Sequence, residues 1–171
     1  MNSILARWHA LPAEEAAAEI LSCCGSHTWA RKLTAMRPFA DEQSLFAAAN
    51  ECWQRLPPAD WLEAFRSHPR IGEQHAQNKT TATSAAWSKS EQSQMKDADA
   101  AILMRMRERH REYEERFGRI FIVCASGRPP AELLRILEHR LKNDPAQELV
   151  ESAAQQQQIM QLRLRKWLGA A

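Results

Sequence analysis

Apolar residues recur at three- and four-residue spacing through most of this sequence, in blocks separated by proline, glycine and helix-capping residues. The block Leu45, Phe46, Ala49 and Trp53 is typical, because Asp41 before it can cap a helix whose apolar stripe faces a core. The pattern predicts an all-α fold, a single compact, bundle-like domain over residues 1–171. About eight helices are expected, packed by the apolar stripe that each of them carries.

Proline, glycine and capping residues set the expected limits of each helix. We expect helices at about residues 2–8, 12–24, 26–37, 41–56, 59–67, 88–116, 129–141 and 144–168. Residues 75–86 are small and polar without periodicity, which predicts a loop. The apolar run 120–125, between Gly118 and Gly127, has no second strand pattern to pair with, so we expect a buried extended segment.

The composition is typical of a protein that buries its own core. The chain has 171 residues, of which 44% are hydrophobic, enough for one domain without disulfides or a structural metal. A formal net charge of +2, from 23 basic and 21 acidic residues, lacks the basic excess of a nucleic-acid-binding protein. No apolar run reaches the roughly 18 residues of a membrane span. The four cysteines form no Cys-x-x-Cys pair, which predicts reduced thiols in a cytoplasmic protein.

His68 begins the stretch whose residues are best suited to chemistry. It precedes Pro69, which restricts the backbone, and Gly72, which allows a ligand to approach closely. Because a residue before proline avoids the helical conformation, the preceding helix must end here and place His68 at its carboxyl end. An imidazole can give and take a proton at neutral pH, and Glu91 follows the expected loop. These two side chains are therefore a candidate acid/base pair.

Ser88 and Glu91 also match a capping box, in which the two side chains bind backbone N–H groups and do no chemistry. The spacing alone favours this structural interpretation. The two roles are compatible, because Ser88, Glu91 and Gln92 would share one face at the start of a helix. Free N–H groups at such a start can bind a substrate carboxylate.

A metal site is a weaker interpretation of the same region. His68, Glu73 and His75 match no zinc-ligand spacing, and no cysteine lies nearby in the sequence. We therefore expect no metal ion.

Arg163 is expected to project from the apolar side of the last helix. Its neighbours one turn away include Ile159, Met160 and Trp167. A guanidinium that faces inward needs a partner, which could be a carboxylate of the protein or an anionic group of a substrate.

Five short motifs occur in one order along the chain. They are His68-Pro69-Arg70-Ile71-Gly72, Ser88-x-x-Glu91-Gln92, Phe117-Gly118 followed by Phe121-Ile122-Val123-Cys124-Ala125, Arg140-Leu141-x-Asn143-Asp144, and Glu148-Leu149. Together with Trp29, Arg37-Pro38 and the run 60–65, they resemble the OHCU decarboxylases. Those enzymes act on 2-oxo-4-hydroxy-4-carboxy-5-ureidoimidazoline (OHCU). The likeness extends from about Ile4 to Trp167, although Arg119-Ile120 replaces a usual proline and Ser93-Gln94-Met95 replaces usual glycines.

The resemblance implies an all-α protein without a metal or organic cofactor that decarboxylates OHCU to (S)-allantoin, the last step of urate breakdown. It implies His68 as the catalytic proton donor, assisted by Glu91. It also implies a set of substrate-binding residues: Pro69, Ser88, Lys89, Ser90, Gln92, the backbone of Phe121, Ile122, Val123, Cys124 and Ala125, and Arg163. The resemblance further hints at a homodimer.

The implied reaction needs no cofactor to accept electrons, because the electron pair left when carbon dioxide departs can move into the substrate's own C=N group. Two other functions stay open. One is a hydrolase that opens a related ureide ring with the same His68 and Glu91 pair; it would release no carbon dioxide. The other is a helical binding module without activity, in which Glu91 only caps a helix.

Overall fold

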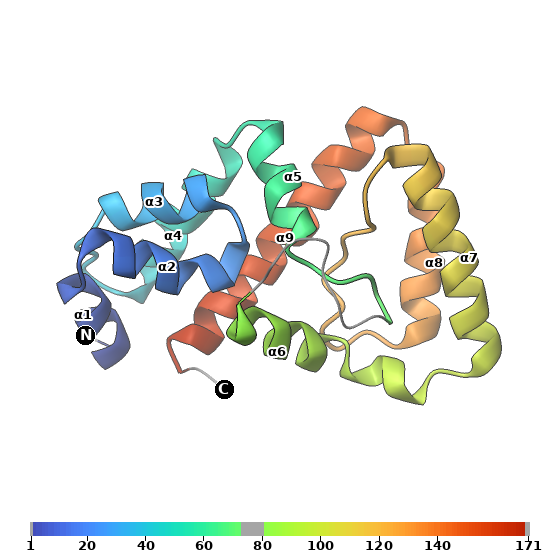
Figure 1. Ribbon diagram of the computed structural model, residues 1–171, viewed down its shortest axis with the longest axis horizontal. Helices are drawn as coiled ribbons and strands as arrows, with labels where there is room; N and C mark the ends of the chain where they lie inside the picture. The colour runs from blue at the N-terminus through green and yellow to red at the C-terminus, as the bar shows by residue number, and fades with distance from the viewer. Residues whose placement is uncertain (1, 73–80, 170–171) are drawn as a thin grey trace. The chain divides into compact units, whose positions relative to one another are not determined.

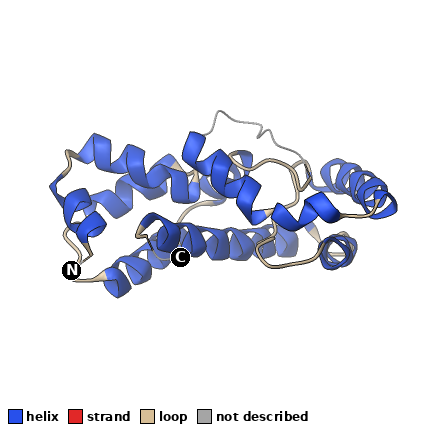
Figure 2. Ribbon diagram, turned by 90° about the horizontal axis from the view of Figure 1, so that it is seen from below, coloured by secondary structure: helices blue, strands red, loops and turns tan. Residues whose placement is uncertain are grey.

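The computed structural model describes residues 2–72 and 81–169 (Figure 1). Within these ranges every regular element is a helix, and loops connect the helices (Figure 2). In chain order the elements are α1 (Ser3–Ala10), α2 (Ala13–Cys24), α3 (His27–Ala35), α4 (Glu42–Gln54), α5 (Pro58–Arg66), α6 (Ala82–Glu91), the 3-10 helix η1 (Ser93–Asp97), α7 (Ala100–Phe117), α8 (Pro130–Arg140) and α9 (Pro145–Trp167). The all-α prediction is confirmed, and the described residues contain nine α-helices where about eight were expected.

The chain divides into two compact units. The first consists of Met1–Ala64 and Gln157–Ala171, and therefore contains α1 to α4, most of α5 and the end of α9. The second, Phe65–Gln156, contains α6, η1, α7, α8 and the beginning of α9. That residues 1–171 act as a single domain stays a prediction.

The helix limits in the first unit follow the predicted capping residues, and α3 packs against both α2 and α4 (Figure 1). Gly25 ends α2 with φ of 85°, a left-handed conformation that suits a residue without a side chain. Ser26 caps α3 by accepting a hydrogen bond from the Trp29 backbone N–H at 3.2 Å. Asp41 and Ser44 form a capping box at the start of α4. These starts and ends are confirmed.

Buried tryptophans are the largest groups in the core of the first unit. Trp8 and Trp29 are fully enclosed, yet each indole N–H has an acceptor. Trp8 Nε1 donates to the Ala16 carbonyl at 2.9 Å and Trp29 Nε1 to the Ala49 carbonyl at 3.1 Å. Each ring therefore contributes its large apolar area without leaving a buried donor unsatisfied.

The second unit differs from the sequence-based prediction. The long helix expected over residues 88–116 is wrong: α6 ends at Glu91, η1 follows, and α7 begins at Ala100. Asp99 starts α7, because its carboxylate accepts a hydrogen bond from the Ala101 backbone N–H at 2.7 Å.

The expected loop at residues 75–86 is wrong in its second half. Residues 82–86 belong to α6, and residues 75–80 lie outside the described residues. Thr81 caps this helix by accepting a hydrogen bond from the Ser84 backbone N–H at 3.0 Å. The buried residues of α6 are Ser84 and Ser88, so its inward face is polar and leaves no apolar periodicity in the sequence.

Residues 120–125 form a buried segment outside any helix or strand, as predicted. The helices α7 and α8 pack together in the same unit (Figure 1). The core that they share with this segment consists of Ile71, Met95, Met106, Tyr113, Phe121, Val123, Ala125, Leu133, Leu137 and Leu141. Among the described residues, no helix has the length and apolar character needed to cross a membrane.

Candidate active site

The backbone after α5 brings His68 and its neighbours to the site. The helix ends at Arg66, and the His68 N–H donates to the Phe65 carbonyl at 3.1 Å. His68 is 7% exposed, so its imidazole is almost enclosed by protein. Gly72 has φ of 87°, and its N–H donates to Gln92 Oε1 at 2.8 Å. This hydrogen bond joins the His-Pro-x-x-Gly motif to the end of α6.

The end of α6 supplies the second group of candidate residues. Ser88 is buried, Glu91 is half-buried, and Gln92 is the residue at which the helix terminates. The capping box expected at Ser88 and Glu91 is wrong, because Thr81 caps α6 and these residues lie in its last turn. An anion site on free N–H groups at a helix start is therefore wrong for these residues too.

A pocket of about 850 Å³ opens where these two segments meet α7. Pro69, Ser88, Lys89 and Gln92, four of the predicted substrate-binding residues, line it. Its volume lies within the range of about 300–1,000 Å³ that small-molecule sites occupy. The sequence motifs around His68 and Ser88 therefore converge on one cavity of suitable size.

The wall that α7 contributes to this pocket consists mainly of cationic and apolar residues. Arg107, His110 and Arg111 line it together with Glu114, one helical turn further on. Arg70 binds the Glu114 carboxylate with two nitrogens, Nε and Nη2, the latter at 2.8 Å from Oε2. This guanidinium lowers the pKa of Glu114 from its usual value, whereas burial acts in the opposite direction. The carboxylate thus stays ionised and paired at neutral pH.

Other predicted site residues do not line the pocket directly. His68 and Glu91 are each adjacent in sequence to a lining residue, and Ser90 is an exposed residue of α6. The segment 121–125 approaches the pocket wall through Phe121, whose ring centre lies 6.1 Å from that of His110. The roles predicted for these residues in catalysis and binding stay predictions.

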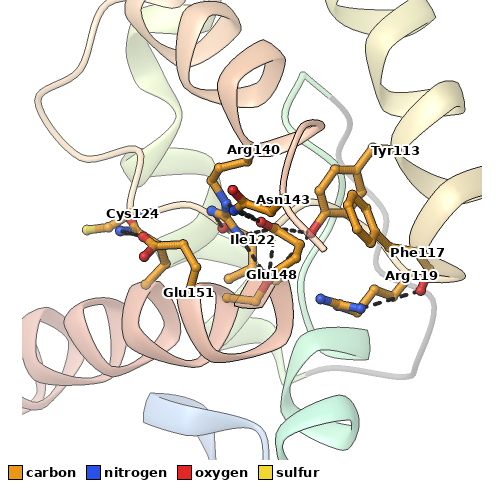
Figure 3. A network of polar contacts seen from close by, with 11 residues as sticks. Tyr113, Phe117, Arg119, Ile122, Cys124, Arg140, Asn143, Glu148 and Glu151 are labelled. Atoms are coloured by element: carbon orange, nitrogen blue, oxygen red, sulfur yellow. Dashed lines mark hydrogen bonds and ion pairs between the residues drawn. The ribbon is translucent and has the colours of Figure 1, made fainter. Parts of the chain in front are cut away.

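The extended segment is held by side chains of α8 and α9 (Figure 3). Arg140 Nη1 donates to the Ile122 carbonyl at 2.5 Å, and the Cys124 N–H donates to Gln155 Oε1 at 3.0 Å. Glu148 is fully buried and accepts hydrogen bonds from Arg140, from the Tyr113 hydroxyl and from Asn143. The Arg140-Leu141-x-Asn143-Asp144 and Glu148-Leu149 motifs therefore build the internal support of residues 120–125.

One cation–π contact and one contact between aromatic rings complete this support. The Arg140 guanidinium lies 4.7 Å from the centre of the Phe121 ring, and that ring packs edge-on against Tyr113. Burial and the hydrogen bond to Glu148 raise the pKa of the Tyr113 hydroxyl, which therefore stays protonated as a donor.

Arg163 belongs to the first unit and faces inward, as predicted, with 1% of its surface exposed. Its Nη1 donates to the Ser22 carbonyl at 3.4 Å. Burial raises the pKa of the neighbouring Cys23 thiol, although Arg163 acts in the opposite direction. The arginine thus has a partner within the protein, and its role in substrate binding stays a prediction.

Residues that could bind a metal ion do not cluster in the described ranges 2–72 and 81–169. No group of three or more histidine, cysteine, aspartate or glutamate residues there could hold a metal ion. Glu73 and His75, which the weaker metal interpretation requires, lie outside the described residues.

Comparison with known proteins identifies the family. The model of the OHCU decarboxylase family matches residues 9–165, which is most of the chain. The chain belongs to the OHCU decarboxylase family.

Curated relatives of this OHCU decarboxylase family member come from distant organisms. It is 36% identical over 145 residues to a uric acid degradation bifunctional protein of Arabidopsis thaliana, a match that covers 84% of this chain and 44% of the relative. It is 34% identical over 131 residues to a 2-oxo-4-hydroxy-4-carboxy-5-ureidoimidazoline decarboxylase of Amia calva, covering 75% of this chain and 73% of the relative. The chain therefore spans less than half of the plant protein.

Solved structures agree with the family assignment. A crystal structure of an OHCU decarboxylase in the presence of (S)-allantoin has 35% sequence identity and a TM-score of 0.75, covering 88% of this chain and 97% of that chain. A crystal structure of an (S)-allantoin synthase has 18% identity and a TM-score of 0.71, covering 95% of this chain and 53% of that chain. The second likeness concerns the fold alone.

The wall that α7 contributes to the pocket of this OHCU decarboxylase family member was not predicted from the sequence. Residues at helical spacing in the expected helix 88–116, Met106, His110 and Tyr113 among them, favoured a face buried in the core. Arg107 and Arg111 flank that face at a spacing of four residues, so they were the available signal. Met106 and His110 line the pocket, whereas the Tyr113 hydroxyl donates a hydrogen bond to Glu148.

Proposed function

We propose that this protein removes carbon dioxide from OHCU and forms (S)-allantoin, using its own side chains and no cofactor. The observation that carries this proposal is the convergence of Pro69, Ser88 and Gln92, from two separate family motifs, on one pocket of about 850 Å³. The match of the family model to residues 9–165 supports the same reaction.

In the proposed reaction, the bond between the ring carbon and the carboxylate breaks and its electron pair moves into the substrate's adjacent C=N group. The carboxylate leaves as carbon dioxide. This leaves a double bond between that carbon and the neighbouring ring carbon, while the nitrogen of the C=N group takes up a proton. His68 then donates a proton from one face to the neighbouring carbon, which was the carbon of the C=N group, so a single enantiomer forms. The hydroxyl on the decarboxylated carbon loses its proton and becomes a carbonyl group of allantoin. The nearly enclosed position of His68 supports this role, because a proton donor shielded from water keeps its orientation.

The proposed binding groups orient the ring relative to that proton donor. Gln92 is fixed by the hydrogen bond from the Gly72 N–H to its Oε1, which leaves its amide nitrogen as a donor for a substrate oxygen. Ser88 lines the pocket one helical turn before Gln92 and supplies a hydroxyl on the same side of α6. Both groups can hold the substrate while the bond to carbon dioxide breaks.

Glu91 is proposed to assist His68. It lies in the last turn of α6, so it does not cap the start of the helix as the structural interpretation of the sequence required. Glu91→Gln keeps the size and hydrogen-bonding ability of the side chain but not its charge. We expect this variant to lose activity by at least about 100-fold, within the range for a positioned acid or base, while its thermal midpoint stays near that of the wild type. Activity within about twofold of wild type would remove Glu91 from the mechanism.

The decisive experiment supplies freshly generated OHCU to the purified protein. Circular dichroism follows the formation of optically active allantoin, and mass spectrometry follows the release of carbon dioxide, each corrected for the reaction without protein. The rival hydrolase would consume OHCU without releasing carbon dioxide, and a binding module would leave the uncatalysed rate unchanged. Either outcome would overturn the proposal.

Two further expectations from the sequence stay predictions. The homodimer can be measured by sedimentation equilibrium of the purified protein. The cytoplasmic location can be measured by fractionation of the source cells.

A further inference from the structure

One face of α7 forms a continuous wall of the candidate pocket. Its members recur at three- and four-residue spacing, as expected for one side of a helix. They are Leu103, Met106, Arg107, His110, Arg111 and Glu114. The two arginines are exposed residues one helical turn apart, so their guanidinium groups belong to the same side of the helix.

The charges of the described pocket residues are strongly unbalanced. Four cationic side chains and one carboxylate line the pocket, which gives a formal charge of +3 with His110 neutral. Arg70 already neutralises that carboxylate, Glu114. No described carboxylate lies within ion-pair distance of Lys89, Arg107 or Arg111, so no described acid neutralises their charges.

Apart from Glu114, the acidic residues of α7 lie away from this wall. Glu108, Glu112 and Glu115 do not line the pocket, and Glu112 forms an ion pair with Arg109 on another side of the helix. A surface helix with many acids thus presents a basic face to the cavity. This separation of charge favours an anionic ligand.

We propose that Arg107 and Arg111 form an anion-selective wall, which draws in the carboxylate-bearing substrate and favours release of the uncharged product. The inference rests on the proposed function, because OHCU carries a carboxylate that leaves as carbon dioxide and allantoin has none. In a pocket of about 850 Å³ the wall acts mainly through its field and does not require close contact with every part of the ligand. Neither arginine belongs to the motifs that define the family resemblance.

The kinetic test uses the double variant Arg107→Gln/Arg111→Gln. Glutamine keeps a comparable helix propensity, so the fold of α7 is retained. The matched control is Arg135→Gln, which removes one exposed arginine of α8 outside the pocket. At low salt we expect kcat/KM of the double variant to fall about 10-fold, with kcat within about twofold of wild type. Raising the salt concentration to about 0.5 M should reduce the difference in kcat/KM between the wild type and the double variant, because salt ions screen the electric field of the arginines.

Inhibition by (S)-allantoin distinguishes an electrostatic role of the two arginines from a role in shaping the pocket. Because the product is uncharged, replacing the two arginines should leave its inhibition constant unchanged. Equal loss of substrate efficiency and product binding would mean that the arginines only shape the pocket, and the proposal would be wrong. An effect no larger than that of the Arg135→Gln control would also overturn it.

A binding test works even for a protein that fails to decarboxylate OHCU. Isothermal titration compares hydantoin-5-acetate, which carries a ring and a carboxylate, with uncharged hydantoin. We expect the wild type to bind the acetate more tightly and the double variant to lose that preference. A wild type with this preference but without decarboxylase activity would refute the proposed function and support the wall. A wild type with no preference for the carboxylate would refute the wall, whatever its activity.

Discussion

Replacing Glu148 with leucine tests the buried polar network of the second unit. The Glu148 side chain is fully buried, and that of its partner Arg140 is 4% exposed. In wild type, Glu148 Oε1 lies 2.5 Å from Arg140 Nη2 and 2.5 Å from the Tyr113 hydroxyl, and Oε2 accepts from Asn143 Nδ2 at 2.8 Å. Leucine removes the negative charge and all of these acceptors at once.

The expected loss follows from the cost of a buried charge without its partner. Arg140 would remain enclosed beside an apolar side chain, and breaking such a pair destabilises a protein by about 3–5 kcal/mol. For a protein of this size, that loss lowers the thermal midpoint by about 6–20 °C. The exposed pair Arg105 and Glu138, with side chains 48% and 39% exposed, provides the contrast. Arg105→Gln should cost no more than about 1 kcal/mol, because water and salt screen that interaction.

The assay is urea unfolding followed by far-ultraviolet circular dichroism, on wild type, Glu148→Leu, Arg140→Met and the double variant. The double variant leaves neither charge unpaired, so its loss should be smaller than the sum of the two single losses by about 3 kcal/mol. It still lacks the donor to the Ile122 carbonyl, which costs about 1–3 kcal/mol. A Glu148→Leu variant that loses less than about 1 kcal/mol, or single losses that simply add, would refute this reasoning.

Three further predictions concern the site. His68→Ala should lower activity by about 10²- to 10⁴-fold without unfolding the protein, whereas His139→Ala, a matched change at an exposed residue of α8, should not; near-full turnover by the first variant would exclude His68 as the proton donor. Arg163→Met should lower catalytic efficiency by roughly 1.5–3 kcal/mol if the arginine binds substrate, whereas a loss of thermal stability with unchanged kinetics would make it a structural residue. The pKa of Glu114 is lower in the folded protein than in the unfolded chain, so Arg70 stabilises the fold above the unfolded pKa and this contribution disappears as the pH falls through the lowered value. Urea unfolding should therefore show a gap of up to about 1 kcal/mol between wild type and Glu114→Gln at pH 7 that closes in acid, and a gap independent of pH would contradict this assignment.

The first unit was predictable because its helices carry both apolar stripes and recognisable caps. Asp41 and Ser26 precede α4 and α3, and Gly25 ends α2, so each limit has a local chemical cause. The extended segment 120–125 was predictable for a different reason. It is apolar throughout, and the sequence offers no second strand with which it could pair.

The region of the site was harder to predict, because α6 buries serines in place of apolar residues. Ser84 and Ser88 face inward, so the helix shows no hydrophobic periodicity and its true cap, Thr81, was overlooked. The capping box predicted at Ser88 has matching residue types, but these residues lie at the carboxyl end of the helix, where they cannot cap its start. Asp99, which starts α7, was absorbed into one long helix because the apolar stripe continues on both sides of it.

The residues around the pocket were partly predictable. Pro69, Ser88 and Gln92 were identified from short motifs, which reflect local backbone and side-chain requirements. The basic wall of α7 was not predictable from the sequence. Exposed arginines on a helix are common, and only the tertiary fold shows which of them border a cavity. Sequence spacing places residues on one side of a helix but does not say what lies opposite.

The way in which residues 120–125 are supported has a consequence for the tolerance of this chain to substitution. In a β-sheet, a strand's backbone groups bind another backbone, and a change of side chain leaves those bonds in place. Here the Ile122 carbonyl depends on the side chain of Arg140 and the Cys124 N–H on that of Gln155. A library of all single substitutions should therefore tolerate conservative apolar exchanges within the segment better than changes at residues 140 and 155, which lie outside it in the sequence. The positions that define the path of this backbone are thus encoded in two helices that follow it.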